Sequence, residues 1–466
     1  MPSPRPPLLV GALCVPLSAW SLLGCEPLTQ PDEVPPAACD DCEAAPRACR
    51  WYVAPEGDSD NVGVVASAPL TLEEASARAM PGDTVCILPG TYSRTEPFYP
   101  ARSGTADAMI VYRGEGGEAR LVWDGPPRGE ADDANLIHFF EGTNYIEVRG
   151  LTLDGRDRTD ANVKCAESHH LNIVGNRIIG GGTAGIASKF CDYIAAVGNQ
   201  VYHSGYFGGW SSGISLNSHQ WSDDYPGIHS YVIGNVISGS YDSSTNHTDG
   251  NGIILDLSNN TYDPASADTP PALVANNVVF QNGGRCIVLY IVSNGWVINN
   301  TCYRNGLDRQ VGNPLELLAN KSRNSWWLNN LAVGWNDTGA CLETVDGEGM
   351  AYGRNWSFNC DDRIRIDVVI DDRPVAQGDP LLNDPPGVHP SDDQQWSRAV
   401  TPWDLGERAL EPADDSPLID AGLDPAQLEG LPPELLEDLI RLLGTDAAGR
   451  PRIQGTAIDI GAYEIR

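Results

Sequence analysis

The sequence predicts an all-β fold, a right-handed parallel β-helix, from three observations. A degenerate repeat runs from Gly150 to Phe358, and each unit contains an asparagine flanked by apolar residues. A second short apolar segment follows each of the first six asparagines by 10 to 18 residues. Segments of four to six residues are too short for a helical solenoid. Stacked parallel strands suit them, because one coil cannot bury its inner face alone, and parallel crossovers are almost always right-handed.

The repeated asparagines mark the coils. Their spacings are 23, 36, 42, 23, 30 and 25 residues, which indicates a short basic coil with insertions in some units. We expect each asparagine to adopt a left-handed conformation at a corner and its amide to bond the next asparagine in the stack. The seven residues are Asn176, Asn199, Asn235, Asn277, Asn300, Asn330 and Asn355.

Residues 1–25 are typical of a targeting segment. Arg5 precedes an apolar run that is too short and too broken for a membrane span. The run ends in Leu-Leu-Gly-Cys25, which resembles a bacterial lipobox and implies lipidation of Cys25. An ordinary secretory signal is the alternative. Both interpretations place the mature chain outside the cytoplasm, anchored by lipid to the envelope or secreted.

Residues 26–49 are rich in Pro, Asp, Glu and Ala, and we expect a disordered tether. Without Cys14 and Cys25, ten of the 12 cysteines remain, an even number that suits disulfides. Cys39-x-x-Cys42 is assigned to that framework, with zinc as the alternative. Two further pairs can join neighbouring coils: Cys286 with Cys302, and Cys341 with Cys360.

The net charge of −33 disfavours nucleic acid as a partner. It also disfavours a polyanionic substrate unless a metal ion lies between the two. We expect a monomer whose partner is a polysaccharide or oligosaccharide, with membrane contact only through the lipid anchor.

The folded region begins near Trp51, and we assign residues 50–380 to the β-helix. Thr71 and Glu74 form a capping box that opens a short helix ending near Met80. A helix before the first strands can cover the open end of a β-helix. Residues 381–466 form the closing segment, in which residues 432–444 predict an amphipathic helix packed on the last coils.

Residues 51–92 resemble the opening module of secreted bacterial β-helix proteins with the pectate-lyase fold. The shared motifs are Trp-Tyr-Val, a helix, Pro-Gly-Asp-Thr-Val and Gly-Thr-Tyr. Ser-Pro-Leu-Ile-Asp-Ala-Gly at 416–422 and Asp-Ile-Gly-Ala-Tyr-Glu at 459–464 resemble the closing segment of the same proteins. The module occurs in polysaccharide lyase family 9, so the resemblance implies this fold and a polysaccharide lyase activity. Family 9 calcium sites use Asp-Gly-Phe contexts, which Asp249-Gly250 matches in part, and no Gly-Phe-Lys is present to supply the family's catalytic lysine.

Four insertions gather around two successive coils, before and after the apolar segments that begin at Ile214 and Ile253. Such loops can wall a groove. Their aromatic residues either stack on sugar rings or pack the loops on the barrel. These residues are Tyr206, Phe207, Trp210, Trp221, Tyr225 and Tyr262.

Aligning the second segments places polar residues at two outward positions, with neighbours about 4.8 Å apart. Three residues after the first apolar residue, the alignment reads Lys189, Asn217, Asp256, Tyr290, Leu318 and Val345. Two residues before it, the alignment reads Ala184, Ser212, Asn251, Arg285, Asn313 and Ala340. The prediction is one mixed patch, with Lys189 at its edge: His247, Asp249, Asn251, Asp256 and Arg285.

This patch suits β-elimination on a uronic-acid glycan. A metal ion, expected to be Ca²⁺, would neutralise the sugar carboxylate and acidify the neighbouring C–H; its expected ligands are Asp249, Asn251 and Asp256. Arg285, or Lys189 as second choice, would remove the proton. The expected substrate-binding residues are His247, Asn217, Tyr290, Trp210 and Trp221. The alternative is a solvated polar face with an Asn/Asp ladder and an Arg–Asp pair.

Two other functions fit the same fold. Glu316 and Glu343 are predicted at one outward position on successive coils, about 4.8 Å apart. That spacing approaches the roughly 5–5.5 Å between the carboxyl groups of retaining glycoside hydrolases. The third hypothesis is a non-catalytic surface lipoprotein that binds glycans through the groove.

Overall fold

The computed structural model describes residues 48–207, 212–256, 268–308, 310–311, 315–335, 339–387, 399–406 and 408–466. The predictions for Cys25, Cys39, Cys42, Trp210, Tyr262 and Asn313 lie outside these ranges. The chain divides into residues 1–35 and residues 36–466, and the fold below belongs to the second unit. Within the described ranges, the helices are too short or too polar to span a bilayer.

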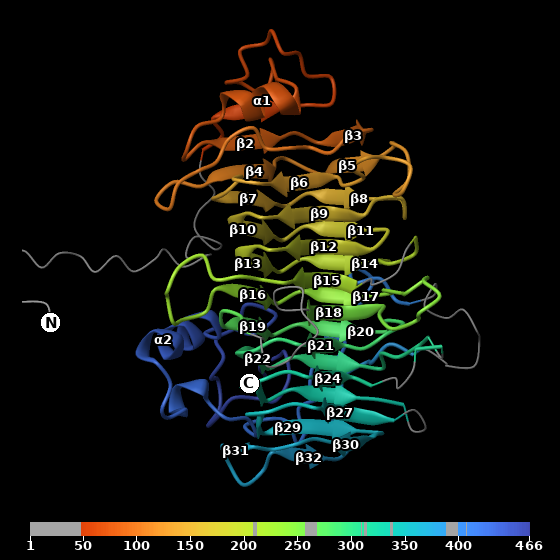
Figure 1. The fold of residues 1–466 in the computed structure, drawn as a ribbon, viewed down its shortest axis with the longest axis vertical. Helices are drawn as coiled ribbons and strands as arrows, with labels where there is room; N and C mark the ends of the chain where they lie inside the picture. The colour runs from red at the N-terminus through yellow and green to blue at the C-terminus, as the bar shows by residue number, and fades with distance from the viewer. Residues whose placement is uncertain are drawn as a thin grey trace, which may run out of the picture. The chain divides into compact units, whose positions relative to one another are not determined.

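Three parallel sheets, stacked coil upon coil, confirm the predicted β-helix (Figure 1). Sheet A contains β1 (Trp51–Val53), β2 (Thr84–Ile87), β4 (Ile110–Gly114), β7 (Ile146–Arg149), β10 (His169–Val174), β13 (Asp192–Val197), β16 (Ser230–Ile233), β19 (Ala272–Ala275), β22 (Gly295–Ile298), β25 (Trp326–Leu328), β28 (Ala351–Gly353) and β31 (Val368–Val369). Sheet B contains β3 (Gly90–Arg94), β5 (Ala119–Trp123), β8 (Thr152–Asp154), β11 (Arg177–Ile179), β14 (Gln200–Tyr202), β17 (Val236–Ser238), β20 (Val278–Phe280), β23 (Thr301–Tyr303), β26 (Leu331–Val333), β29 (Asn355–Phe358) and β32 (Val375–Gln377).

Sheet C supplies the face on which the site was predicted. It contains β6 (Ile137–Phe140), β9 (Ala161–Ala166), β12 (Ala184–Lys189), β15 (Ser212–Asn217), β18 (Asn251–Asp256), β21 (Ile287–Tyr290), β24 (Leu317–Asn320), β27 (Ala340–Val345) and β30 (Asp361–Arg363). Its inward residues form an aliphatic row in register, with Ile186 beside Ile214, then Ile253 and Ile287. All four are buried in the main core. Stacking of identical rows therefore holds the coils together, as the repeat predicts.

The seven predicted asparagines form one continuous ladder between sheets A and B. Asn277, for example, donates its backbone N–H (3.0 Å) and Nδ2 (2.9 Å) to Oδ1 of Asn300. The amide-to-amide bond of the prediction is confirmed, but the left-handed corner is not at the asparagine. The residue before it has the positive φ, as at Gly175 (60°) and Asn276 (56°). The asparagine side chain thus bonds across coils while its predecessor turns the backbone.

A second, shorter ladder lies between sheets B and C. Asn282 accepts the N–H of Ser240 (2.9 Å) and donates Nδ2 to Asn305 (2.8 Å). Asn305 in turn donates its backbone N–H (2.9 Å) and Nδ2 (2.6 Å) to the carboxyl group of Glu316. Glu316 is buried and ends this ladder.

Among the described residues, two α-helices flank the sheets. Helix α1 (Leu72–Arg78) lies at the N-terminal end beside β2 (Figure 1), and Thr71 accepts the N–H of Glu74 at 3.2 Å, as the capping motif predicts. Helix α2 (Pro433–Leu442) confirms the predicted amphipathic segment. Its apolar face packs on Tyr231 and Leu273 of sheet A, so it lies against middle coils rather than the last ones.

Four disulfides join residues of this unit within the ranges that the structure describes. Cys286–Cys302 and Cys341–Cys360 confirm the two pairs predicted to join coils. Two further disulfides occur, Cys49–Cys86 and Cys165–Cys191. Disulfides persist in oxidising compartments, which agrees with an extracytoplasmic protein.

Candidate functional site

The insertions flank sheet C at both ends of β15 and β18. Residues 203–211 and 239–250 connect sheet B to sheet C, whereas residues 218–229 connect sheet C to sheet A. A glycan on this face would therefore meet different loops at the two ends of the strands.

Thr248, Asp249, Asn251 and Arg285 form a hydrogen-bonded group at the start of β18, here called the Asp249 cluster. The Asp249 carboxylate accepts Thr248 Oγ1 (2.8 Å) and Asn251 Nδ2 (3.1 Å). Asn251 Oδ1 accepts the backbone N–H of Arg285 at 3.0 Å. Arg285 Nη1 donates to the carbonyl oxygen of Thr248 at 2.8 Å. The structure thus brings together three predicted site residues: Asp249, Asn251 and Arg285.

The electrostatics of this cluster favour proton transfer near neutral pH. Burial raises the pKa of Asp249 to about 6, and the nearby Asp242 acts in the same direction. The hydrogen bonds from Thr248 and Asn251 and the charge of Arg285 limit that rise. Burial lowers the pKa of Arg285. A carboxyl group with a pKa near 6 is suited to general base catalysis.

The sequence analysis did not select two supporting residues: Asp242, which holds the cluster, and Asp308, which holds the neighbouring His247. Asp242 Oδ2 accepts the backbone N–H groups of Thr248 (2.9 Å) and Asp249 (3.1 Å). Asp308 Oδ2 lies 3.1 Å from Nδ1 of His247. Asp242 had a local signal, because aspartate before Ser-Ser-Thr is typical of a turn, and it accepts the N–H of Ser244 at 2.8 Å. Asp308 had no such signal.

The predicted single patch divides into two groups. Lys189, Asn217, Asp256 and Tyr290 do form one row across the strands, as the alignment predicts. Asn217 donates Nδ2 to Asp256 Oδ2 at 3.1 Å. This row, however, lies at the other end of the strands from the cluster. Asn251 and Asp256 are the two ends of β18, about 16 Å apart at the usual rise per residue.

This separation is incompatible with the predicted calcium site. Asp249, Asn251 and Asp256 do not converge on one ion, because ligand oxygens must lie about 2.3–2.6 Å from Ca²⁺. Asn251 also turns its Nδ2, a donor, toward Asp249 and its Oδ1 toward the Arg285 N–H. The three predicted ligands do not fit a calcium ion, and no step below uses one.

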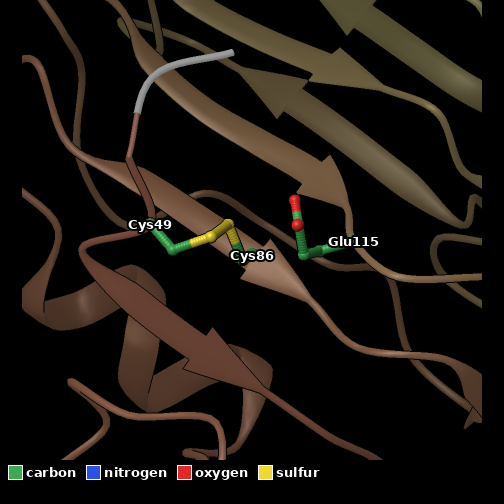
Figure 2. A group of neighbouring side chains, drawn as sticks. All are labelled: Cys49, Cys86 and Glu115. Atoms are coloured by element: carbon green, nitrogen blue, oxygen red, sulfur yellow. A yellow bond between two sulfur atoms is a disulfide. The ribbon is translucent and has the colours of Figure 1, made fainter.

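Other groupings of potential metal ligands in the described part of the chain contain disulfide cysteines. One is Cys49, Cys86 and Glu115 (Figure 2), and the other is Cys286, Cys302 and Glu316. In each, the two sulfurs are bonded to one another, so neither supplies the thiolates that a metal site needs. Glu115 is instead paired with Arg113 at 2.6 Å.

The carboxylate pair of the hydrolase hypothesis is absent at the predicted place. Ile287 pairs with Leu317 rather than Leu315, a shift of two residues from the predicted alignment. Glu343 therefore lies beside Leu318, while Glu316 is buried at the end of the second ladder. The prediction failed because the alignment was wrong by two residues at Leu317 and because Glu316 was assumed to face outward.

On its outward side, sheet C also carries apolar side chains, and these are covered by other parts of the protein. Ile254, Val288 and Leu318 follow one another in register and are buried, with Tyr290 packed beside them. Lys189 is exposed, and its Nζ lies 5.2 Å from the ring centroid of Phe190. Trp221 is 39% exposed, in the loop at the far end of β15 from the Asp249 cluster. Lys189 and Trp221 are therefore not brought to the cluster.

Comparison with known proteins agrees with the resemblance predicted from the sequence motifs. A segment of 99 residues is 33% identical to pectate lyase PEL9 of Emericella nidulans, covering 21% of this chain and 24% of that protein. The chain is thus similar to a pectate lyase. The match spans about a quarter of that relative's length, and no family model matches the sequence.

Two solved structures are also similar to the chain. Pectate lyase Pel9A is 14% identical with a TM-score of 0.48, covering 92% of this chain and 100% of that one. A glycoside hydrolase is 10% identical with a TM-score of 0.47, covering 71% and 95%.

Proposed function

We propose that this protein is a polysaccharide lyase that cleaves a uronic-acid-containing glycan by β-elimination at the Asp249 cluster. The observation that carries this proposal is the Asp249 carboxyl group, whose pKa is raised to about 6 beside the Arg285 guanidinium. A lyase needs a base for the proton next to the sugar carboxylate and a cation for that carboxylate. Similarity to pectate lyase PEL9 supports the same reaction class.

In this mechanism Arg285 binds the sugar carboxylate rather than acting as the base. Its guanidinium matches a carboxylate geometrically, and its Nη1 is already oriented by the carbonyl of Thr248. Asp249 takes the proton from the carbon that bears the carboxylate. The electron pair of that C–H bond forms a carbon–carbon double bond as the bond to the neighbouring glycosidic oxygen breaks. The leaving oxygen takes a proton from water.

The other predicted assignments remain proposals. His247, beside Thr248 and held by Asp308, is close enough in the chain to contact a sugar bound at the cluster. Asn217 and Tyr290, in the row at the other end of the strands, would contact more distant sugar residues. We propose an extracytoplasmic location, which the four disulfides support, with lipid anchoring at Cys25.

The test is product formation by the purified chain on polygalacturonate, alginate and a glycosaminoglycan, with calcium and with chelator. A lyase produces unsaturated uronates that absorb in the near ultraviolet. Asp249→Asn should lower the rate by about 10²–10⁴, and Arg285→Ala should raise KM for uronates. Lys189→Ala is the matched control, because Lys189 lies at the other end of its strand.

Each other outcome points to a named alternative. Loss of activity in Lys189→Ala alone would place the chemistry at the other row. Reducing ends without near-ultraviolet absorbance would identify a hydrolase. Retention of oligosaccharide without products would identify a glycan-binding protein.

A further inference from the structure

A hollow of about 450 Å³ lies where the chain passes from sheet C to sheet A, at the opposite strand ends from the Asp249 cluster. Three successive turns line it. The lining includes Glu167, His169, Asp192, Gln220, Trp221 and Ser222.

The hollow exists because one of these turns is long. Between sheets C and A, β9 reaches β10 through residues 167–168, and β12 reaches β13 through residues 190–191. From β15 to β16 the chain uses the twelve residues 218–229. This loop turns back over the two short turns. The Cys165–Cys191 disulfide ties the second of these turns to β9.

Hydrogen bonds to neighbouring coils and to α2 hold the loop in place. The backbone N–H of Gln220 bonds the carbonyl of Cys191 at 3.2 Å. Ser222 donates its N–H (2.8 Å) and Oγ (2.7 Å) to Asp192 Oδ2. At the loop's end, Asp438 of α2 accepts the N–H of Ile228 at 2.8 Å. A wall that is already ordered saves the entropy that binding otherwise costs.

Trp221 is held as a platform on this wall. Its indole meets the ring of His229 edge-on, with centroids 4.9 Å apart and planes at 77°. His229 stacks in turn on Tyr193 at 4.4 Å, and its ring is fixed by Asp192. Trp221 is nevertheless 39% exposed. An aromatic side chain that is fixed and partly exposed in a hollow is suited to stacking against the C–H face of a sugar ring.

The charge of the hollow disfavours a uronate. Within the described residues, its lining contains carboxylates from Glu167 and Asp192 and no lysine or arginine. Burial lowers the pKa of His169, so this imidazole is neutral at neutral pH. Asp192 is engaged by His229. Glu167 is the exposed carboxylate of the lining, and Lys189, outside the lining, lies next to it, with Nζ 5.2 Å from the ring centroid of Phe190. Glu167, Gln220 and Ser222 offer the acceptors and donors that sugar hydroxyl groups use.

We propose that this hollow binds a neutral pyranose residue, stacked on Trp221 and hydrogen bonded by Glu167 and Gln220, at a site separate from the Asp249 cluster. The proposal goes beyond the proposed lyase activity and does not depend on it. A glycan with both charged and neutral residues would occupy both sites.

The experiment compares two ligands that differ at one carbon. β-Linked oligosaccharides of galactose carry a hydroxymethyl group where those of galacturonate carry a carboxylate, and mannose and xylose oligosaccharides extend the neutral panel. Binding to the full chain is measured by calorimetry. We expect a neutral oligosaccharide to bind, Trp221→Ala to weaken it about tenfold or more, and Trp221→Phe to retain part of the affinity. Arg285→Ala should leave the affinity for neutral oligosaccharides unchanged. Glu167→Gln should reduce the preference for galactose over galacturonate.

Three results would overturn the proposal. They are no binding by any neutral oligosaccharide, unchanged affinity in Trp221→Ala, and tighter binding of galacturonate than of galactose by the unmodified chain. Loss of neutral binding in Arg285→Ala would place the ligand at the Asp249 cluster instead. Lyase activity is recorded separately, so failure of the lyase proposal leaves this measurement intact.

Discussion

Replacing Glu316 with glutamine should remove a large part of the pH dependence of stability. Burial raises the pKa of this carboxyl group from 4.5 to about 8. Between these values the folded state holds a proton that the unfolded chain has released, so stability falls as pH rises through the window. The slope is about 1.4 kcal/mol per pH unit. Over the whole window the effect approaches about 5 kcal/mol at most.

The assay is chemical denaturation followed by tryptophan fluorescence, at several pH values from about 5 to about 8. Glu316→Gln cannot ionise, so its free energy of unfolding should fall less steeply by about 1.4 kcal/mol per pH unit. Other titrating groups are common to both proteins and cancel in the difference. Glu343→Gln, on the outer face of β27, removes a carboxylate without touching the ladder and should keep the original slope. If the free energy of unfolding fell equally steeply with pH in the unmodified chain and in Glu316→Gln, this reasoning would be refuted.

Three further outcomes follow from the same contacts. Asn277→Ala should lower stability by about 2–5 kcal/mol in denaturation, because two buried Asn235 donors lose their acceptor; exposed Asn246→Ala should change it little. The kcat/KM of the lyase reaction should rise about tenfold per pH unit up to about 6 and then level, because Asp249 must be ionised, and a flat profile would exclude it as the base. Asp438→Ala should weaken neutral-sugar binding in calorimetry without changing lyase turnover, since it releases the 218–229 loop; equal affinity would contradict a fixed wall.

The fold could be predicted from the sequence because its main stabilising element is a repeated residue type. An asparagine at each corner is visible as a spacing, and its cross-coil bond follows from amide chemistry. The identity of the left-handed residue was not visible in the same way. Gly175, Asn276 and Arg354 all precede ladder asparagines with positive φ. Since different residue types occupy that position, the asparagine after it was the only constant signal.

The site was harder to predict, because register and distance along a strand are separate quantities. The alignment placed Lys189, Asn217, Asp256 and Tyr290 in the right row. The predicted patch then combined that row with Asn251 and its neighbours, although Asn251 lies five residues before Asp256 on the same strand. The two-residue error at Leu317 had a different cause, since the leucines of Leu315-Glu-Leu fit an alternating strand equally well in either register. Burial of Glu316 depends on Asn305, a contact that no local pattern encodes.

The two proposed sites follow from one property of a solenoid. Short turns between sheets repeat in every coil and leave no room for a ligand, so a hollow forms only where a turn is lengthened. Lengthening a loop costs little stability, because loop-closure entropy grows slowly with length. Here the insertions fall at both ends of the same strands, and residues of neighbouring coils give the two ends different charges: Arg285 lies at one end and Glu167 at the other. A uniform polyuronate would suit only the Asp249 cluster. The two sites together therefore favour a heteropolymer in which charged and neutral sugars alternate or branch.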